Sequence, residues 1–326
     1  MVAKTGFAEC FKSGQGILME GALGERLKTE YGIRFHERLV MAALVEEQQG
    51  RSALKKLWQE YGCIAIRHQL PFIATTPTRR LNSDRLSGSG HDASLVEKNV
   101  ALLREVKEQL VAEGLREMYI GGMLGCRGDA YTGEGAIEDE GQAERFHAFE
   151  AELFAAAGAD FLYAALQPNL SEAAGMALAM SKTGLPYIIS FTLRRDGRLI
   201  DGSLLTEAID YIDSLSEERP LCYMANCIHP RFVYEALSQP FNQFDVVRHR
   251  FCGIQANSAA AEYDVLEHGL KLPQSDAEVL AEDMLKLRRL CDCRIFGGCC
   301  GTDGTHMEAI AERLAADRGE KGFSVL

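Results

Sequence analysis

The sequence predicts an α/β protein built as one (β/α)8 TIM barrel, a single domain that covers residues 1–326. Its 326 residues and 47% hydrophobic composition provide a large core, and α/β barrels reach this length as one domain. Short apolar runs alternate with stretches of helical periodicity, and eight strands each followed by a helix fit a closed barrel better than an open sheet. A doubly wound sheet is the alternative, and it requires one or two wrong strand assignments.

The predicted strands are apolar runs that are too short for helices and rich in residues that suit buried parallel strands. They are Gly16–Gly21, Pro71–Thr76, Met118–Leu124, Asp160–Leu166, Tyr187–Leu193, Leu221–Asn226, Phe251–Ala256 and Arg294–Gly298.

The predicted helices are amphipathic stretches between these runs. Ser171 is the expected N-cap of one of them, and the polar stretch Asn82–Ala93 is expected to be a surface loop. The helices are Ser52–Gln69, Ser94–Glu113, Gly141–Ala157, Ser171–Thr183, Asp276–Cys291 and Thr305–Ala315.

Composition narrows the class of protein. The net charge of -12 opposes binding to nucleic-acid phosphates, so we expect no nucleic-acid partner. No run approaches the roughly 18 apolar residues of a membrane helix, and the N-terminus has no secretory pattern, so we expect a cytoplasmic protein with no membrane partner. In that reducing compartment, clustered cysteines among the ten present favour metal binding or catalysis over disulfides.

Residues that could take part in catalysis or metal binding follow several predicted strands. In a TIM barrel the carboxyl ends of all strands meet at one mouth, where the active site lies. The residues expected there are Glu20, Thr75, Thr76, Gly125, Cys126, Cys227, Asn257, Cys299 and Cys300.

Three of these cysteines form a candidate zinc site. Cys299 and Cys300 lie in a glycine-rich turn, where both sulfurs can reach one metal, and Cys227 follows the sixth strand at the same mouth. Zinc prefers such soft ligands, and a catalytic zinc keeps its fourth position open. The alternatives are that the pair only packs within its turn, or that His229 is a ligand.

The remaining cysteines have a structural interpretation. Cys291 and Cys293 fall at the start of the last strand, on the opposite mouth, and are expected to be structural. Four scattered cysteines are expected to be small buried hydrophobic residues. They are Cys10, Cys63, Cys222 and Cys252.

Motifs along nearly the whole chain add a resemblance. In order, they are Glu20-Gly21-Ala22-Leu23-Gly24, Gly121-Gly122-Met123-Leu124-Gly125-Cys126, the Ala157–Asp160 turn, Asn226-Cys227, and Gly297-Gly298-Cys299-Cys300-Gly301-Thr302. The set is similar to the motifs of the homocysteine S-methyltransferase family, and its last member matches without change. The resemblance implies a (β/α)8 barrel with one catalytic zinc on Cys227, Cys299 and Cys300, and homocysteine sulfur in the fourth position.

The sequence departs from the family pattern at several positions. Glu20 replaces an aspartate, Ala22 a glycine, and Cys126 a proline. Ala165 replaces a glutamate that in the family helps to hold the amino group of homocysteine, and a proline is absent before Asn257.

The predicted function is therefore zinc-dependent transfer of a methyl group from S-methylmethionine or S-adenosylmethionine to homocysteine, which gives methionine. Zinc would deprotonate the bound thiol for attack on a sulfonium methyl group. Two alternatives are a zinc-thiolate enzyme of the same family that acts on another sulfur compound, because of Ala165, and a zinc store without catalysis. The sequence is compatible with a homo-oligomer and leaves the methyl donor open.

The predicted substrate contacts surround the cysteines. Glu20 is predicted to hold the substrate ammonium or the cationic donor, with a turn-capping carboxylate as the structural alternative. The other predicted contacts are Gly21, Ala22, Thr75, Thr76 and Asn226.

Overall fold

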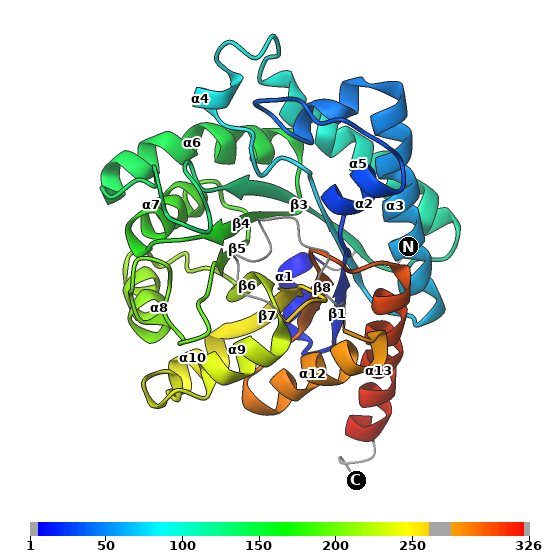
Figure 1. Ribbon diagram of the computed structural model, residues 1–326, viewed down its shortest axis with the longest axis vertical. Coiled ribbons are helices and arrows are strands. Elements are labelled where there is room, and N and C mark those ends of the chain that lie inside the picture. The colour runs from blue at the N-terminus through cyan, green and yellow to red at the C-terminus, as the bar shows by residue number, and fades with distance from the viewer. Residues whose placement is uncertain (1–5, 261–274, 323–326) are drawn as a thin grey trace.

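A computed structural model describes residues 6–260 and 275–322, and its strands close into one parallel barrel in the order β1 to β8 (Figure 1). Closure is made by β1 and β8, where Ile17 is opposite Ile295. The predicted fold class is thus confirmed, and every predicted strand is present. The strands are β1 Ile17–Met19, β2 Phe72–Thr75, β3 Met118–Gly125, β4 Phe161–Gln167, β5 Tyr187–Phe191, β6 Cys222–Ile228, β7 Phe251–Ala256 and β8 Ile295–Gly298.

Helices surround this barrel and cover the outer faces of its strands (Figure 1). The longer ones are α3 Gln48–Arg67, α5 Ser94–Ala112, α6 Glu140–Ala157, α7 Leu170–Ser181, α8 Leu205–Ser214, α12 Ala277–Leu290 and α13 Gly304–Gly322. The shorter ones are α1 Phe7–Lys12, α2 Gly24–Thr29, η1 Ala42–Glu46, α4 Ser83–Leu86, α9 Pro230–Leu237, η2 Pro240–Asn242 and α10 Asp245–Arg250.

The predicted helices are all present, with corrected ends. The N-cap of α7 is Asn169 rather than Ser171, because the Asn169 side chain accepts a hydrogen bond from the backbone N–H of Glu172 at 2.9 Å. The loop predicted at residues 82–93 contains the single turn α4, which is capped by Asn82. The helices α1, α2, α4 and α10 are one to two turns long, so little apolar periodicity marks them in the sequence, and they were not predicted. The helices α8 and α9 were also not predicted, although their buried apolar residues recur at helical spacing.

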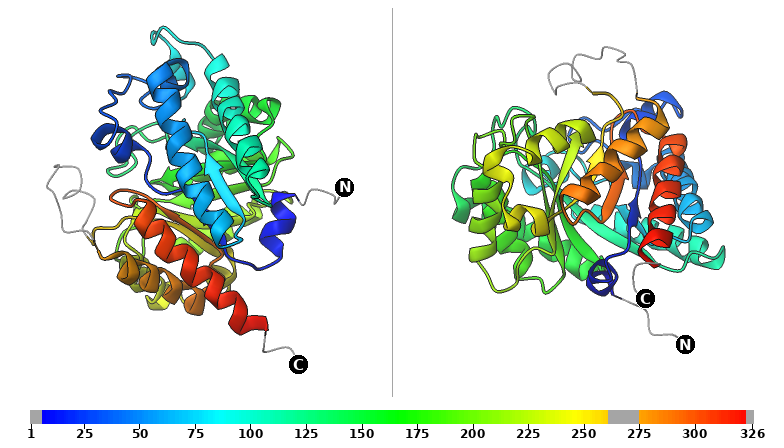
Figure 2. Two further views of the ribbon diagram at one scale, coloured as in Figure 1. Left: turned by 90° about the vertical axis from the view of Figure 1, so that its right-hand side faces the viewer. Right: turned by 90° about the horizontal axis from the view of Figure 1, so that it is seen from below.

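The barrel interior is a packed core rather than a pore. Side chains from alternate strand positions fill it, and α1 closes its amino-terminal mouth, where Phe7 stacks on Phe161 at 4.2 Å between ring centroids. Figure 2 shows α1 at the end of the barrel opposite the β8–α13 connection. The interior is thus filled from one end, and open space is left at the carboxyl-terminal mouth. No helix of the described residues is long and apolar enough to cross a membrane.

Candidate active site

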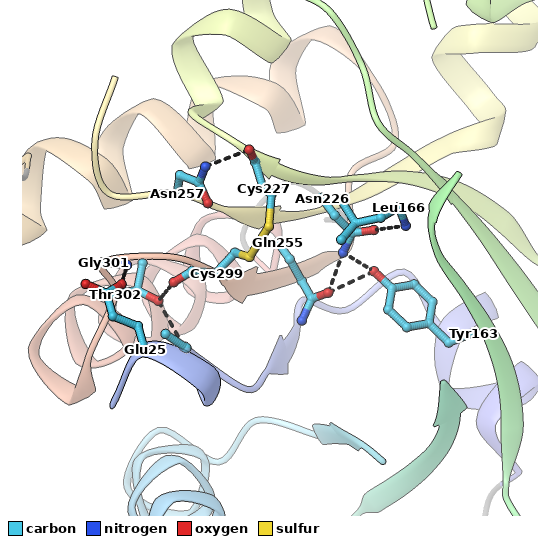
Figure 3. Close-up of a disulfide and its surroundings, with 11 residues drawn as sticks. Glu25, Tyr163, Leu166, Asn226, Cys227, Gln255, Asn257, Cys299, Gly301 and Thr302 are labelled. Carbon is cyan, nitrogen blue, oxygen red and sulfur yellow. Dashed lines mark hydrogen bonds between the residues drawn. A yellow bond between two sulfur atoms is a disulfide. The ribbon is translucent and has the colours of Figure 1, made fainter. Parts of the chain in front are cut away.

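Three cysteine sulfurs meet at the carboxyl-terminal mouth of the barrel. The Sγ atoms of Cys227, Cys299 and Cys300 all lie within 4.8 Å of one another, and no other such group of metal-binding side chains occurs within residues 6–260 and 275–322. Cys227 and Cys299 are joined as a disulfide, with their Cα atoms 5.5 Å apart (Figure 3). Metal binding by all three thiolates therefore requires this pair to be reduced.

A bulge at the end of β6 gives Cys227 its position. The pairing of β6 with β7 shifts register between Asn226 and Ile228, and Cys227 lies between them with a φ of 52°. A left-handed conformation costs a non-glycine residue about 1–3 kcal/mol, so the surrounding contacts have to enforce it. One such contact is the Asn257 side-chain amide, which donates a hydrogen bond to the Cys227 carbonyl at 2.6 Å (Figure 3).

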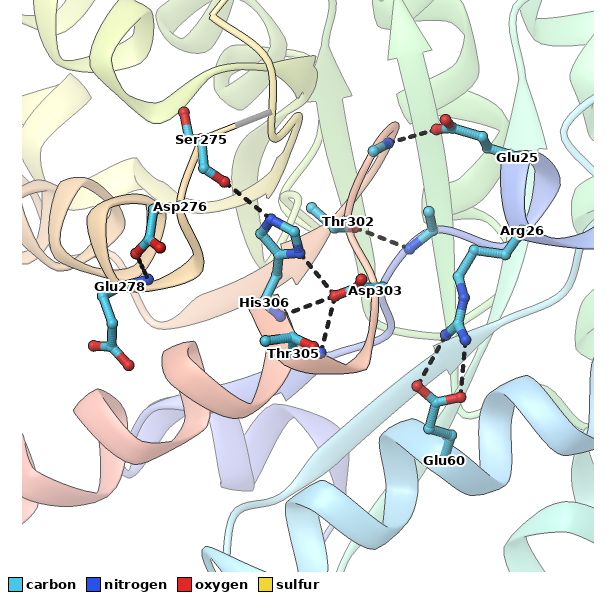
Figure 4. Close-up of polar contacts among 12 residues, drawn as sticks. Glu25, Arg26, Glu60, Ser275, Asp276, Glu278, Thr302, Asp303, Thr305 and His306 are labelled. Atoms are coloured by element: carbon cyan, nitrogen blue, oxygen red, sulfur yellow. Dashed lines mark hydrogen bonds and ion pairs between the residues drawn. The ribbon is translucent and has the colours of Figure 1, made fainter. Parts of the chain in front are cut away.

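The turn that carries Cys299 and Cys300 is fixed on both sides. The Cys299 N–H donates to the Ala256 carbonyl of β7 at 2.7 Å, and the Cys299 carbonyl accepts from the Thr302 hydroxyl at 2.7 Å. Gly301, at a φ of 77°, donates its N–H to a carboxylate oxygen of Glu25 at 2.6 Å (Figure 4). The turn is thus anchored to β7 and to α2.

One glycine of this motif is required by space. A Cβ atom on Gly298 would lie 2.2 Å from the Thr302 hydroxyl oxygen and 3.0 Å from the Cα of Gly21. The same hydroxyl accepts a hydrogen bond from the Ala22 N–H at 3.1 Å, which ties the β8 turn to the β1 turn. Gly298 therefore allows the close backbone approach between these two turns.

The three cysteines line a cavity of about 200 Å³. Most predicted site residues line the same cavity, and the structure adds several that the sequence did not indicate. The predicted ones are Glu20, Gly21, Ala22, Thr75, Thr76, Cys227, Cys299 and Cys300, and the added ones are Leu23, Gly24, Glu25, Met41, Pro77, Arg79, Met123, Tyr131, Gln255 and Gly298. Half of the added residues come from loops, where sequence spacing does not indicate which side chains face inward, and the other half come from α2, β3, β7 and β8.

Glu20 lines the cavity, but its carboxylate is already bound by the protein. One oxygen accepts a hydrogen bond from the indole N–H of Trp58 at 3.0 Å, and both accept from the backbone N–H of Thr75 at 2.9 and 3.1 Å. The Thr75 hydroxyl also donates to this carboxylate. Burial raises the pKa of Glu20 to about 7, against the opposing effect of these hydrogen bonds.

Asn226 lies behind the cavity wall rather than among its lining residues. Its Oδ1 accepts the backbone N–H of Leu166 at 3.1 Å, and its Nδ2 donates to the Tyr163 hydroxyl at 2.6 Å and to Gln255 Oε1 at 2.5 Å. The Leu166 N–H can only donate, so the Asn226 atom that faces it is the amide oxygen, Oδ1. Asn226 Nδ2 then donates to Gln255, so the Gln255 atom that faces it is Oε1, and Gln255 Nε2 is directed away from Tyr163 (Figure 3). Asn226 therefore orients Gln255, which itself lines the cavity.

Cys126 packs against the site without joining the three sulfurs. It is buried in a small cluster with Leu166 and Cys227, and burial raises the pKa of its thiol to about 12. A thiol with that pKa is protonated at neutral pH, whereas zinc binds the thiolate.

His229 is engaged elsewhere. It is the N-cap of α9, where its Nδ1 accepts from the Arg231 N–H at 3.3 Å and its Nε2 lies 3.0 Å from the Ser275 hydroxyl. Burial lowers its pKa to about 4. The alternative that His229 is a ligand is therefore not supported by its geometry.

The structural interpretation of the remaining cysteines holds for all but one. Cys63 is half-buried, and the others are buried. The buried ones are Cys10, Cys222, Cys252, Cys291 and Cys293.

The family model for homocysteine S-methyltransferase matches residues 17–314, which include every strand and all three cysteines. The chain belongs to the homocysteine S-methyltransferase family. This assignment makes the protein a methyltransferase. A comparison with curated proteins found no match.

Solved structures of the *Escherichia coli* homocysteine methyltransferase MmuM share the fold. The metallated form has a TM-score of 0.74 at 22% identity and covers 93% of this chain and 98% of its own. The oxidized form has a TM-score of 0.74 at 21% identity and covers 94% of this chain and 98% of its own. The apo form has a TM-score of 0.68 at 21% identity and covers 93% of this chain and 97% of its own. The similarity extends over nearly the full length of both chains.

Proposed function

We propose that the protein is a zinc-dependent S-methyltransferase that moves a methyl group from a sulfonium donor, S-methylmethionine or S-adenosylmethionine, to homocysteine and so forms methionine. The observation that carries the proposal is the convergence of three cysteine sulfurs within 4.8 Å on the wall of a cavity, in a chain of this family.

The sulfur geometry fits zinc. Three thiolates within 4.8 Å of one another are the soft ligands that zinc prefers, and they become available when the Cys227–Cys299 pair is reduced. Cys300 is exposed and lines the cavity together with Cys227 and Cys299, so a fourth ligand can approach from the cavity side. Zinc bound to these residues would bind the acceptor thiol in its fourth position and remove its proton.

The protein groups around the site orient and polarise the reactants. Asn257 and Thr302 hold the carbonyls of Cys227 and Cys299, and these contacts fix the direction of the two sulfurs. Glu20 is proposed to attract the ammonium of the acceptor or the positive charge of the donor. Glu20 is itself buried, and a charge interaction is stronger in a buried environment than in bulk water.

A second candidate function keeps the zinc thiolate and changes the acceptor. Its support is Ala165 at the end of β4, which is buried in the barrel interior and supplies no carboxylate to the cavity. Under this alternative the enzyme methylates another small thiol.

The test is a metal and activity measurement on the reduced full-length protein. We expect about one zinc per chain, and methionine formation from homocysteine with at least one of the two sulfonium donors. Zinc without methionine, together with methylation of another thiol in a panel, would favour the second function. Zinc without any methyl transfer would leave a metal store and contradict both enzyme proposals.

A cysteine series tests the ligand assignment. Cys299→Ser is expected to lose both zinc and activity, whereas Cys252→Ser, which alters a buried cysteine outside the site, keeps both. Zinc retained by the Cys299 variant would overturn the assignment.

A further inference from the structure

Arg79 brings a positive charge to the cavity. It lies in the connection between β2 and α4, and it lines the cavity together with the three cysteines. Among the described lining residues it is the one cationic side chain, and the only other charged ones are Glu20 and Glu25. The guanidinium is always ionised at neutral pH.

Among the described residues, the neighbouring arginines have hydrogen-bond or ion-pair partners, whereas the Arg79 guanidinium has none. Arg80 donates to the Gly128 carbonyl at 2.6 Å and lies 3.9 Å from Asp129, and Arg127 pairs with Asp84 at 2.9 Å. Within residues 6–260 and 275–322, no hydrogen bond or ion pair satisfies the guanidinium of Arg79. A guanidinium carries five N–H donors, so this side chain can bind an acceptor that enters the cavity.

The stem of Arg79 is packed rather than free. A Cβ atom on Gly125, at the end of β3, would lie 2.2 Å from the Arg79 carbonyl oxygen and 2.7 Å from its Cγ. Residue 125 therefore has to be glycine for the Arg79 backbone and side-chain stem to fit beside it. Such packing reduces the entropy that the side chain loses when it binds a ligand.

The charge of Arg79 also reaches the cysteine turn. Arg79 and Cys300 line the same cavity. A thiol bound beside Cys300 therefore has a guanidinium near it, within the same cavity of about 200 Å³.

We propose that Arg79 is a specificity-determining residue that binds an acidic group of the acceptor, so that the acceptor class is small thiol acids. The inference rests on the proposed function and deepens it. A guanidinium and a carboxylate form two parallel charge-assisted hydrogen bonds, which is the strongest neutralising contact that the cavity offers. The Glu20 carboxylate, bound by Trp58 and Thr75, does not compete for the guanidinium.

Three thiols separate recognition of the acid from recognition of the amine. They are homocysteine, 4-sulfanylbutanoate, which lacks the amino group, and 3-aminopropane-1-thiol, which lacks the carboxylate. We expect Arg79→Gln to lower kcat/KM about 10- to 100-fold for the two acids and to leave the aminothiol unchanged, since a hydrogen bond to a charged group is lost only with the acids. Arg79→Lys, which keeps the charge and loses the planar fork, should retain part of the preference for acids.

The control is Lys28→Gln, which removes a positive charge from an exposed position of α2 outside the cavity lining. This variant should leave the relative kcat/KM values of the three thiols unchanged. If Arg79→Gln lowers kcat/KM equally for all three thiols, Arg79 acts on the cysteine thiolates rather than on the acceptor. If kcat/KM does not fall for any of them, Arg79 has no role in acceptor binding. Either result overturns the proposal.

Calorimetric binding of the same thiols to the reduced, zinc-loaded protein provides a readout that needs no methyl transfer. If no donor supports turnover, the proposed function fails, while the ratio of dissociation constants between acids and aminothiol still decides the role of Arg79. Failure of the wild-type protein to bind either acid more tightly than the aminothiol would overturn the inference even when turnover is observed.

Discussion

The side-chain amide of Asn257 donates a hydrogen bond of 2.6 Å to the backbone carbonyl of Cys227. The contact connects the residue after β7 to the bulge of β6, so it holds a cysteine whose φ of 52° is intrinsically unfavourable. The direction of the Cys227 sulfur therefore depends on a residue that does not itself face the other two sulfurs.

Asn257→Ala is expected to weaken zinc binding about 10- to 100-fold, as loss of a residue that orients a metal ligand does. The unpaired carbonyl should also cost about 1–3 kcal/mol of unfolding free energy. Zinc competition with a chromophoric chelator and chemical denaturation measure the two effects. Asn242→Ala is the matched control, because Asn242 donates to the carbonyls of Gly197 and Ala236 away from the cysteines. It should lose stability and keep its zinc affinity, and unchanged zinc affinity in the Asn257 variant would contradict the argument.

Cys126→Ser should retain one zinc per chain. Cys126 is buried beside Cys227, and its sulfur lies outside the group of three that could hold a metal. Cys300→Ser, measured by the same metal analysis, should bind zinc poorly. Loss of zinc in the Cys126 variant, with the fold intact by circular dichroism, would make Cys126 a fourth ligand.

The raised pKa of Glu20 is expected to make kcat/KM depend on pH near neutrality. Burial raises its pKa from 4.5 to about 7, so the carboxyl group is neutral below that pH and charged above it. If Glu20 attracts a cation, kcat/KM rises as the pH increases through about 7, and Glu20→Gln removes this rise. The Thr75 hydroxyl lowers the Glu20 pKa, so Thr75→Val should move the rise to higher pH. If the rise of kcat/KM with pH persists in Glu20→Gln, another titrating group is responsible for it.

The buried carboxyl group of Glu150 is expected to make the folded state less stable as the pH rises. It is buried in α6, neither carboxylate oxygen has a hydrogen-bond partner among the described residues, and burial raises its pKa well above the usual value. The folded state then holds a proton that the unfolded state releases, so the stabilising contribution is present at low pH and is lost as the pH rises toward the folded-state pKa. Thermal unfolding at pH 5 and pH 8 should show a larger decrease in Tm for the wild type than for Glu150→Gln. Glu152→Gln, an exposed change in the same helix, should behave like the wild type.

The barrel and the three sulfurs could be predicted from the sequence, because each strand is a distinct apolar run and each cysteine follows one directly. The amide chain from Leu166 through Asn226 to Gln255 could not, since it joins three strands whose register shifts at bulges. Arg79 was missed for a related reason. Nothing in its local sequence distinguishes it from Arg80, and only the structure shows that Arg79 lines the cavity and packs beside Gly125.

The helix α1 closes one mouth of the barrel with Phe7 and its neighbours. If a thiol and a sulfonium compound react above it, both arrive and both products depart through the same opening. The cavity that the three cysteines line lies at that opening. The reactant whose sulfur lies deeper then has to enter first, and its product has to leave last, so the closed end of the barrel would impose a compulsory order on the catalytic cycle.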